Sequence, residues 1–457
     1  MFLLNNYFSN LNVLAQKFCL PLGNFDCSEK VNGVDFAIFS PNFNSSNSSF
    51  DLDNSGLVDL NDALILFNNY GKFNYQNKNN KTVLVIIDQN DFNNLSNQLN
   101  QFKNDIETKL GIPIKIIPLE NLKLQTPDFV REKLISECGL DPVLGCKNIE
   151  GAILVGEVPY ALFDSIYDYN TTAPFMFYYQ DLDSNFAKNS NNHYDRYLTY
   201  GPHEGPEIYI SWIKPINDKN FGTPLQQLSR FFDKHHRYFS GEIKSSNKAV
   251  YAVHCDRGTP PPPTGIFEGN YSPENIIQIY PTDGSCDNIC PLKEKLISAF
   301  KLLPEVAYLH SHATATSIFC LNKDDFFLLE KQPAFIFSWG CHNGNFYRNE
   351  STSTALASIN GKDIGLSYMG KLHAQDINPT VGAKFGNFFN DFFNYWNKGY
   401  SVGQALLKTE TDWANKKSYD GNTYNIYRLS GPLQRIILGS PFVYSETAVF
   451  QFGWPKN

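Results

Sequence analysis

Short apolar segments alternate with amphipathic, helix-like segments from Thr82 onward, and this alternation constrains the fold more than any other feature. The apolar segments are TVLVIID, IPIKIIPL, GAILVGEVP, PEIYISWI, KAVYAVHC, EVAYLHSH, AFIFSWGC and DIGLSYMG, at residues 82–88, 112–119, 151–159, 206–213, 248–255, 305–312, 334–341 and 363–370. Helical patterns at residues 93–110, 128–137 and 224–238 separate several of them. Strands that alternate with helices predict an α/β fold, with a largely parallel sheet flanked by helices.

The composition is that of a folded chain with room for two or three domains. Of the 457 residues, 42% are hydrophobic and 15% are aromatic, which is too apolar for a disordered protein. The formal net charge is −8 and no dense Lys/Arg face stands out, so nucleic acid is not an expected partner. No apolar run reaches the roughly 18 residues that a membrane span needs, and we expect no such span.

The cysteines indicate an oxidising environment. There are nine, and close spacing suggests pairs between Cys138 and Cys146 and between Cys286 and Cys290. Pairs between Cys19 and Cys27 and between Cys255 and Cys320 would complete four disulfides and leave Cys341 as the odd thiol. We therefore expect an extracellular protein, although the opening residues MFLLNNYFSNLNVLAQKF contain no evident signal peptide. The alternative is a cytosolic protein with nine free thiols.

An internal repeat occupies residues 24–62, where NFDCSEKVNGVD at 24–35 matches DLDNSGLVDLND at 51–62, 27 residues later. The second copy has the residue types of an EF-hand-like calcium loop, with Gly56 at the sharp turn. Its predicted ligands are Asp51, Asp53, Ser55, Leu57 and Asp62. The first copy offers Asn24, Asp26, Ser28 and Asp35, but it has Glu29 where the glycine belongs.

Two such loops, each followed by an apolar segment, resemble a dockerin module. The resemblance covers residues 20–73 and implies structural calcium, a helix after each loop and a cohesin-like docking partner. We assign residues 1–78 to this small α-helical module and its linker. The alternative is a pair of Asn/Asp-rich turns that bind no metal.

Cys341 and His312 are the candidate catalytic residues, because each ends an apolar segment and they are 29 residues apart. Neighbouring parallel strands end at one edge of a sheet. A cysteine nucleophile needs an imidazole to favour the thiolate and to protonate the leaving amine. It also needs N–H donors for the oxyanion, for which we expect the backbone of Ala313 and Cys341. His310 faces the same side of its strand, but His312 is favoured because it lies last.

YLHSHATA at residues 308–315, followed by FIFSWGCHNGNF at 335–346, is similar to the gingipain-type cysteine peptidases, which are relatives of caspases and legumains. Weaker matches follow in order, so that the resemblance covers residues 80–445. It implies a caspase-like α/β fold, endopeptidase activity on a protein or peptide, and His312 and Cys341 as a dyad, with no cofactor for catalysis. We divide this region into an N-terminal subdomain, 79–215, and a catalytic subdomain, 216–457.

The chain departs from the family at several positions. Ala313 replaces the glycine that usually follows the histidine, and Ser440 replaces the aspartate of a Gly-Asp-Pro motif. The best-known members cleave after Arg or Lys through an acidic pocket, and Met176 stands where that acid is expected. We therefore expect a neutral P1 preference, unless Asp181 or Asp183 supplies the acid. The competing hypothesis is a non-catalytic binding protein that keeps the peptidase-like fold and is tethered through its calcium loops.

Overall fold

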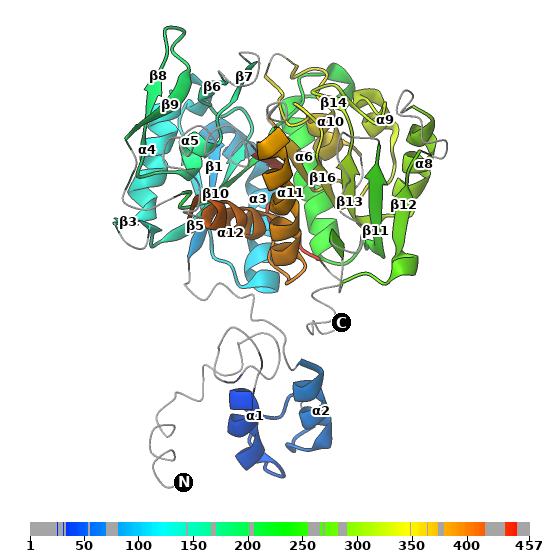
Figure 1. Cartoon of the computed structure of the whole chain (residues 1–457). Helices are drawn as coiled ribbons and strands as arrows, with labels where there is room; N and C mark the ends of the chain where they lie inside the picture. The colour runs from blue at the N-terminus through cyan, green and yellow to red at the C-terminus, as the bar shows by residue number, and fades with distance from the viewer. Residues whose placement is uncertain are drawn as a thin grey trace. The chain divides into compact units, whose positions relative to one another are not determined.

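The computed structural model divides the chain into two units, residues 1–78 with 446–457 and residues 79–445 (Figure 1). It describes residues 25, 31, 33–53, 55–69, 81–142, 145–165, 171–199, 201, 205–254, 266–267, 270–281, 290–347, 349–362, 364–372, 379–415 and 435–445. Among these residues, no helix has the length and apolar character to cross a bilayer.

A ten-stranded sheet forms the centre of the larger unit. Its strands, in spatial order, are β12 (Ile276–Ile279), β11 (Ser246–Val253), β13 (Pro304–His310), β16 (Phe335–Ser338), β17 (Ser367–Lys371), β18 (Arg435–Gly439), β10 (Tyr209–Ile213), β5 (Ile149–Val155), β1 (Thr82–Asp88) and β2 (Ile114–Leu119). The sheet is mostly parallel, and β17 and β18 are antiparallel. This confirms the predicted α/β class. The sheet takes strands from both sides of the predicted boundary at residue 215.

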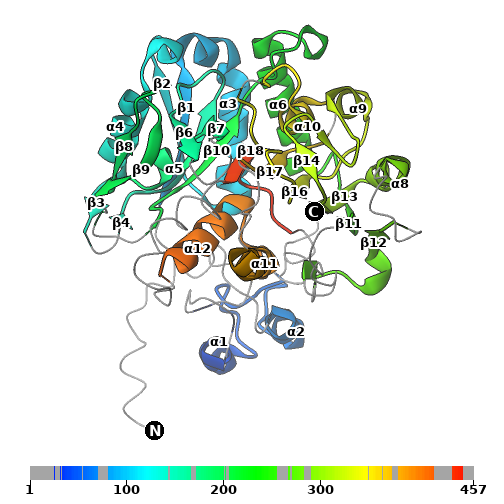
Figure 2. The same ribbon diagram turned by 45° about the horizontal axis from the view of Figure 1, so that its top comes forward.

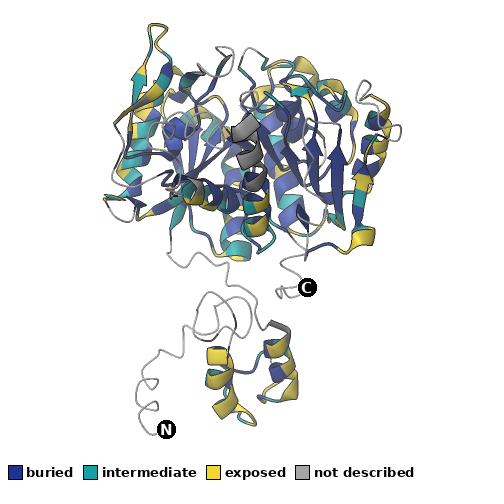
Figure 3. Cartoon of the chain, in the orientation of Figure 1, coloured by how far each residue is buried: buried dark blue, intermediate teal, exposed yellow. Residues whose placement is uncertain are grey.

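Helices cover both faces of this sheet (Figure 2), with α11 (Pro379–Trp396) and α12 (Val402–Asn415) on one face and α3 (Gln89–Leu110), α6 (Pro224–Phe239) and α10 (Thr354–Asn360) on the other. This unit also contains the helices α4 (Pro127–Cys138), α8 (Pro291–Phe300) and α9 (Lys323–Leu328). Helix α6 begins where predicted, because Thr223 and Gln226 form a capping box around Pro224. Buried strands and helices form one hydrophobic core (Figure 3).

A second, four-stranded sheet lies between β5 and β10 in the sequence. It consists of β7 (Thr171–Pro174), β6 (Leu162–Ser165), β9 (Tyr194–Thr199) and β8 (Asn185–Lys188), with the short helix α5 (Phe177–Gln180) between β7 and β8. Arg131 of α4 donates hydrogen bonds to the carbonyls of Tyr178, Asp181 and Ser184. The guanidinium thereby ties α5 and the residues that follow it to α4.

In the described part of the smaller unit lie two short α-helices, α1 (Gly33–Phe39) and α2 (Leu60–Asn69). Their first residues are 27 positions apart, as the two halves of the sequence repeat are. A separate small core joins them, made of Phe25, Val31, Phe39, Phe50, Val58, Ala63 and Leu66.

Cys138 and Cys146 form a disulfide as predicted, with their Cα atoms 4.9 Å apart. Cys341 is a free thiol, also as predicted. Cys19 and Cys27 lie outside the described residues, so their pairing stays a prediction.

A second described disulfide joins Cys290 and Cys320, whose Cα atoms are 5.2 Å apart. The predicted Cys286–Cys290 and Cys255–Cys320 pairs are therefore wrong. Cys290 precedes α8, and Cys320 follows the short strand β15 (Ser317–Ile318), so tertiary folding brings together two residues that sequence spacing keeps apart. Cys255 and Cys286 themselves lie outside the described residues.

His235 on α6 is fully buried and makes stability depend on pH. Its ring stacks on Phe239 with centroids 4.3 Å apart, and its Nε2 lies 3.1 Å from Ser440 Oγ. Burial lowers the pKa of His235 from 6.5 to about 3. Between these values the unfolded chain binds a proton that the folded chain does not, so acidification favours unfolding.

Between pH 7 and pH 5, His235 is expected to lower the free energy of unfolding by about 2 kcal/mol. Denaturant titrations at the two pH values check this on the wild type and on His235→Gln. On acidification, the free energy of unfolding of the variant should fall by about 2 kcal/mol less than that of the wild type. An identical loss in both proteins would contradict the assignment.

Candidate active site

His312 and Cys341 follow two neighbouring strands. β13 and β16 are parallel, with Leu309 opposite Ser338, and the N–H of Trp339 donates to the carbonyl of Leu309 at 2.7 Å. Because the two strands end side by side, the turns that follow them emerge at the same edge of the sheet.

The two turns touch through small residues. A Cβ added to Gly340 would lie 2.2 Å from the Cβ of Ala313, so only glycine permits this approach. His312 is exposed and Cys341 is partly exposed. The residues beside the two candidate catalytic groups are thus in contact, while both reactive side chains stay accessible to solvent.

Asn343 ties the Cys341 turn to the turn that follows His312. Its buried side chain accepts a hydrogen bond from Ser338 Oγ at 2.9 Å and donates to the carbonyl of Thr314 at 2.8 Å. The sequence places an asparagine here, but nothing in its spacing indicates that the side chain bridges two turns. A buried amide whose donors and acceptor are satisfied gives a turn a defined conformation.

The backbone after Cys341 turns sharply. His342 has a φ of 56°, in the left-handed region that is uncommon for residues other than glycine. Gly344 donates its N–H to the carbonyl of Lys371 at 2.7 Å. A tight turn therefore follows the thiol directly, and it is hydrogen-bonded to the end of β17.

The structure places the two candidate histidines in different environments. His310 is 7% exposed, and its Nδ1 lies 3.1 Å from Tyr308 Oη, with Phe389 nearby. His312 lies beyond the strand end and is exposed. Of the two, only His312 has the accessibility that proton exchange with a substrate requires.

The predicted oxyanion donors lie on the same pair of turns. Within the described part of the chain, the N–H of Cys341 has no backbone acceptor. Ala313 begins the short hairpin of β14 (Ala313–Thr314) and β15, where it pairs with Ile318.

Strand β7 reaches the Cys341 turn through Asn345, whose Nδ2 donates to the carbonyl of Thr172 at 3.1 Å. Met176, at the start of α5, is only 2% exposed. Phe346, next to Asn345, packs its ring against Tyr160 with centroids 5.6 Å apart.

The two aspartates proposed as alternative specificity residues lie in a carboxylate cluster. Oxygens of Asp181, Asp183 and Glu207 are all within 4.8 Å of one another. Asp181 is buried and accepts the N–H of Ser184 at 3.1 Å, whereas Asp183 is partly exposed. Sequence reasoning missed Glu207, because it lies 24 residues after Asp183 and no motif links them.

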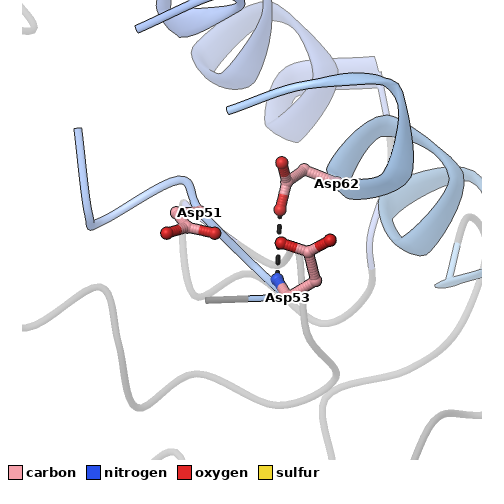
Figure 4. Close-up of side chains that lie close together, drawn as sticks. All are labelled: Asp51, Asp53 and Asp62. Carbon is pink, nitrogen blue, oxygen red and sulfur yellow. Dashed lines mark hydrogen bonds between the residues drawn. The ribbon is translucent and has the colours of Figure 1, made fainter. Parts of the chain in front are cut away.

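In the smaller unit, the carboxylates of Asp51, Asp53 and Asp62 converge, with oxygens within 4.8 Å of one another (Figure 4). Asp62 Oδ1 accepts the N–H of Asp53 at 3.1 Å, and Asp51 Oδ2 accepts the N–H of Gly56 at 2.8 Å. Gly56 has a φ of 92°. Hydrogen bonds from Ser55 hold the pKa of Asp53 below its usual value.

Only some of the other predicted calcium ligands lie among the described residues. Ser55 donates from Oγ to the carbonyl of Leu57 at 3.0 Å, within the same loop. In the first loop, Asp35 is buried in α1, in the position that Asp62 has in α2. Asn24, Asp26 and Ser28 lie outside the described residues.

Comparison with known proteins supports the fold. The structure resembles that of the Arg-specific cysteine proteinase gingipain R, with a TM-score of 0.54, 14% identity, and coverage of 81% of this chain and 79% of that chain. A second structure, described as a protease, has the same TM-score and coverage at 11% identity. No protein-family model and no curated protein sequence matches the chain. Most of the chain therefore has a mixed α/β fold similar to the caspase-like fold of gingipain R.

Proposed function

We propose that the protein is a secreted cysteine endopeptidase with His312 and Cys341 as its catalytic dyad. The observation that carries this proposal is the contact between the two turns, in which Gly340 meets Ala313 and Asn343 bonds to the carbonyl of Thr314. The resemblance in fold to cysteine proteinases supports it.

In the proposed reaction, Cys341 Sγ attacks the carbonyl carbon of the scissile peptide as His312 takes the thiol proton. Backbone N–H groups of Ala313 and Cys341 stabilise the oxyanion. The C–N bond then breaks, and His312 gives the proton to the leaving amine. Water attacks the resulting thioester with His312 as base, and the carboxylic acid product leaves as the thiol is restored.

Secretion is supported by the disulfides Cys138–Cys146 and Cys290–Cys320, since such bonds persist in oxidising compartments. The competing idea, a catalytically inactive scaffold, is not favoured, because the residues beside the candidate dyad meet in open turns. Digestion of a mixed peptide library tests the choice. Cleavage that stops after alkylation with iodoacetamide supports the peptidase, and intact peptides throughout would contradict it.

We expect substrates with a neutral P1 residue to be cleaved at least about tenfold better than Arg or Lys substrates. A buried P1 cation needs a carboxylate partner, and Met176 offers a thioether instead. Asp181 already accepts a hydrogen bond from the N–H of Ser184. Comparing kcat/KM for matched Arg, Lys, Leu and Asn substrates checks this.

A preference for a basic P1 residue would give a different kinetic result. A preference for Arg or Lys of roughly a hundredfold would refute the neutral pocket. Loss of that preference in Asp183→Asn, but not in Asp181→Asn, would identify the partly exposed aspartate as the acid.

We further propose that residues 1–78 form a dockerin-like module that binds calcium and docks onto a cohesin-like partner. Helices α1 and α2 present a largely exposed surface (Figure 3). Large apolar side chains on them are 39% exposed or more: Val34, Phe36, Leu60, Leu64 and Phe67. Exposed apolar groups that cluster on a small unit are typical of a docking surface.

The Asp51–Asp62 loop fits a calcium ion, because three carboxylates converge there beside a glycine turn. Asp51→Asn in the full chain is therefore expected to weaken calcium binding at least about tenfold, and Asp26→Asn in the first loop should weaken it less. Isothermal titration calorimetry measures both. Absence of any calcium-dependent heat in the wild type would refute the module while leaving the peptidase proposal intact.

A further inference from the structure

Trp339, which leads directly into the turn that carries Cys341, is held by two cations. Its ring centroid is 4.3 Å from Cζ of Arg435 and 4.6 Å from Nζ of Lys371. The ring of Phe389 meets the indole edge-on at 3.6 Å between centroids. A cation over an indole is attracted by the ring quadrupole, and the attraction is strongest away from water. The residue before the thiol turn is therefore restrained by charge as well as by packing.

The position of Arg435 carries a desolvation cost, because its charged side chain is only 2% exposed. Its Cζ lies 4.4 Å from the ring centroid of Phe388 and 5.5 Å from that of Phe337. Among the described residues, its Nε and Nη1 have no hydrogen-bond partner. Burial lowers the pKa of Arg435 to about 9, and the charge of Glu410 opposes that change. An apolar side chain would avoid the desolvation cost, so the arginine needs a role besides filling the core.

The residues beside Arg435 on β17 and β18 also contact Gly344, at the other end of the turn. Arg435 pairs with Lys371 across β17 and β18, and the carbonyl of Lys371 accepts the N–H of Gly344. A Cβ added to Gly344 would lie 2.7 Å from Cγ2 of Ile436, the next residue of β18. The start of β18 is thus linked to the residue two before Cys341 and to the residue three after it.

We propose that Arg435 is a positioning residue for Cys341: its guanidinium, which lies over the ring of Trp339, fixes the turn from Trp339 to Gly344 and with it the direction of the thiol. Arg435 acts through Trp339 and does not contact the substrate. A lysine at this position would keep the charge and lose the planar, delocalised guanidinium. The inference rests on the proposed function only for its consequence in catalysis.

Hydrogen exchange of the full-length chain tests the proposal without an activity assay. The test variant is Arg435→Met combined with Glu410→Gln, so that no buried carboxylate loses its cation. The N–H groups of Trp339 and Gly344 should exchange at least about tenfold faster, with β1 and β2 unchanged. Arg435→Lys should show a smaller local rise. The matched control Arg230→Met, at a partly buried arginine on α6, should leave the turn as in the wild type.

The proposal would be overturned if the N–H groups of Trp339 and Gly344 exchanged at the wild-type rate in either Arg435 variant. A uniform rise in exchange rate across the whole sheet would also overturn it. If the double variant does not fold, Arg435→Lys decides alone. In the folded variants kcat should fall about tenfold while KM is unchanged, as expected for a lost positioning interaction. A wild type without turnover would refute the proposed peptidase, whereas the exchange result would still stand.

Discussion

Replacing Cys341 with alanine is expected to lower kcat/KM for a cleaved peptide by at least about a thousandfold. The thiolate is the group that forms the covalent intermediate, and alanine offers no nucleophile in its place. The N–H donors of the turn would remain, so only residual catalysis from substrate binding and oxyanion stabilisation should persist. Steady-state kinetics on a substrate taken from the library digest measures the effect.

The fold of this variant should be intact. Cys341 is the free, partly exposed thiol and forms no disulfide, so the free energy of unfolding should change by less than about 0.5 kcal/mol. Cys341→Ser is the matched control for side-chain size, and it should also lose turnover because a hydroxyl is a far weaker nucleophile at neutral pH. Activity within tenfold of the wild type in Cys341→Ala would remove this residue from the mechanism.

Replacing His312 with alanine is expected to lower kcat by roughly a hundredfold to ten-thousandfold, the range that a general acid–base residue contributes. The side chain is exposed, so its loss should leave stability almost unchanged. His310→Ala provides the comparison, because that ring is buried against Tyr308. It should cost stability, on the order of 1–3 kcal/mol, and keep the specific activity of the folded fraction within about tenfold.

Kinetics and denaturant unfolding, measured on both variants, separate these roles. The assignment is wrong if His310→Ala loses turnover at full stability while His312→Ala remains active. Loss of activity in both at full stability would indicate that the two imidazoles work together.

The fold could be predicted to the extent that its strands are continuous apolar runs. Each of the eight predicted segments overlaps a strand of the large sheet, including β1, β13 and β16. β12 and β18 are not among the predicted segments, because their runs IIQI and RIILG are only four and five residues long. The four-stranded sheet was missed because its strands are short and carry many polar residues, such as NFAK in β8.

The candidate site could be predicted where a topological rule applies. Parallel neighbouring strands end together, so the proximity of the turns after His312 and Cys341 follows from two apolar segments and their order. Asn343, Glu207 and Arg435 could not be found in this way, because their roles depend on partners that only tertiary folding supplies. The Cys290–Cys320 disulfide could not be predicted for the same reason.

Cys341 is proposed to be an activated nucleophile at a peptide-binding site. A peptidyl chloromethyl ketone with a neutral P1 residue tests this role most directly, with mass spectrometry of digests to locate and count the label. We expect one label per chain, on Cys341, added at least about a hundredfold faster than to the same thiol in the denaturant-unfolded chain. Labelling spread over several residues, or no faster at Cys341 in the folded chain than in the unfolded one, would contradict the account.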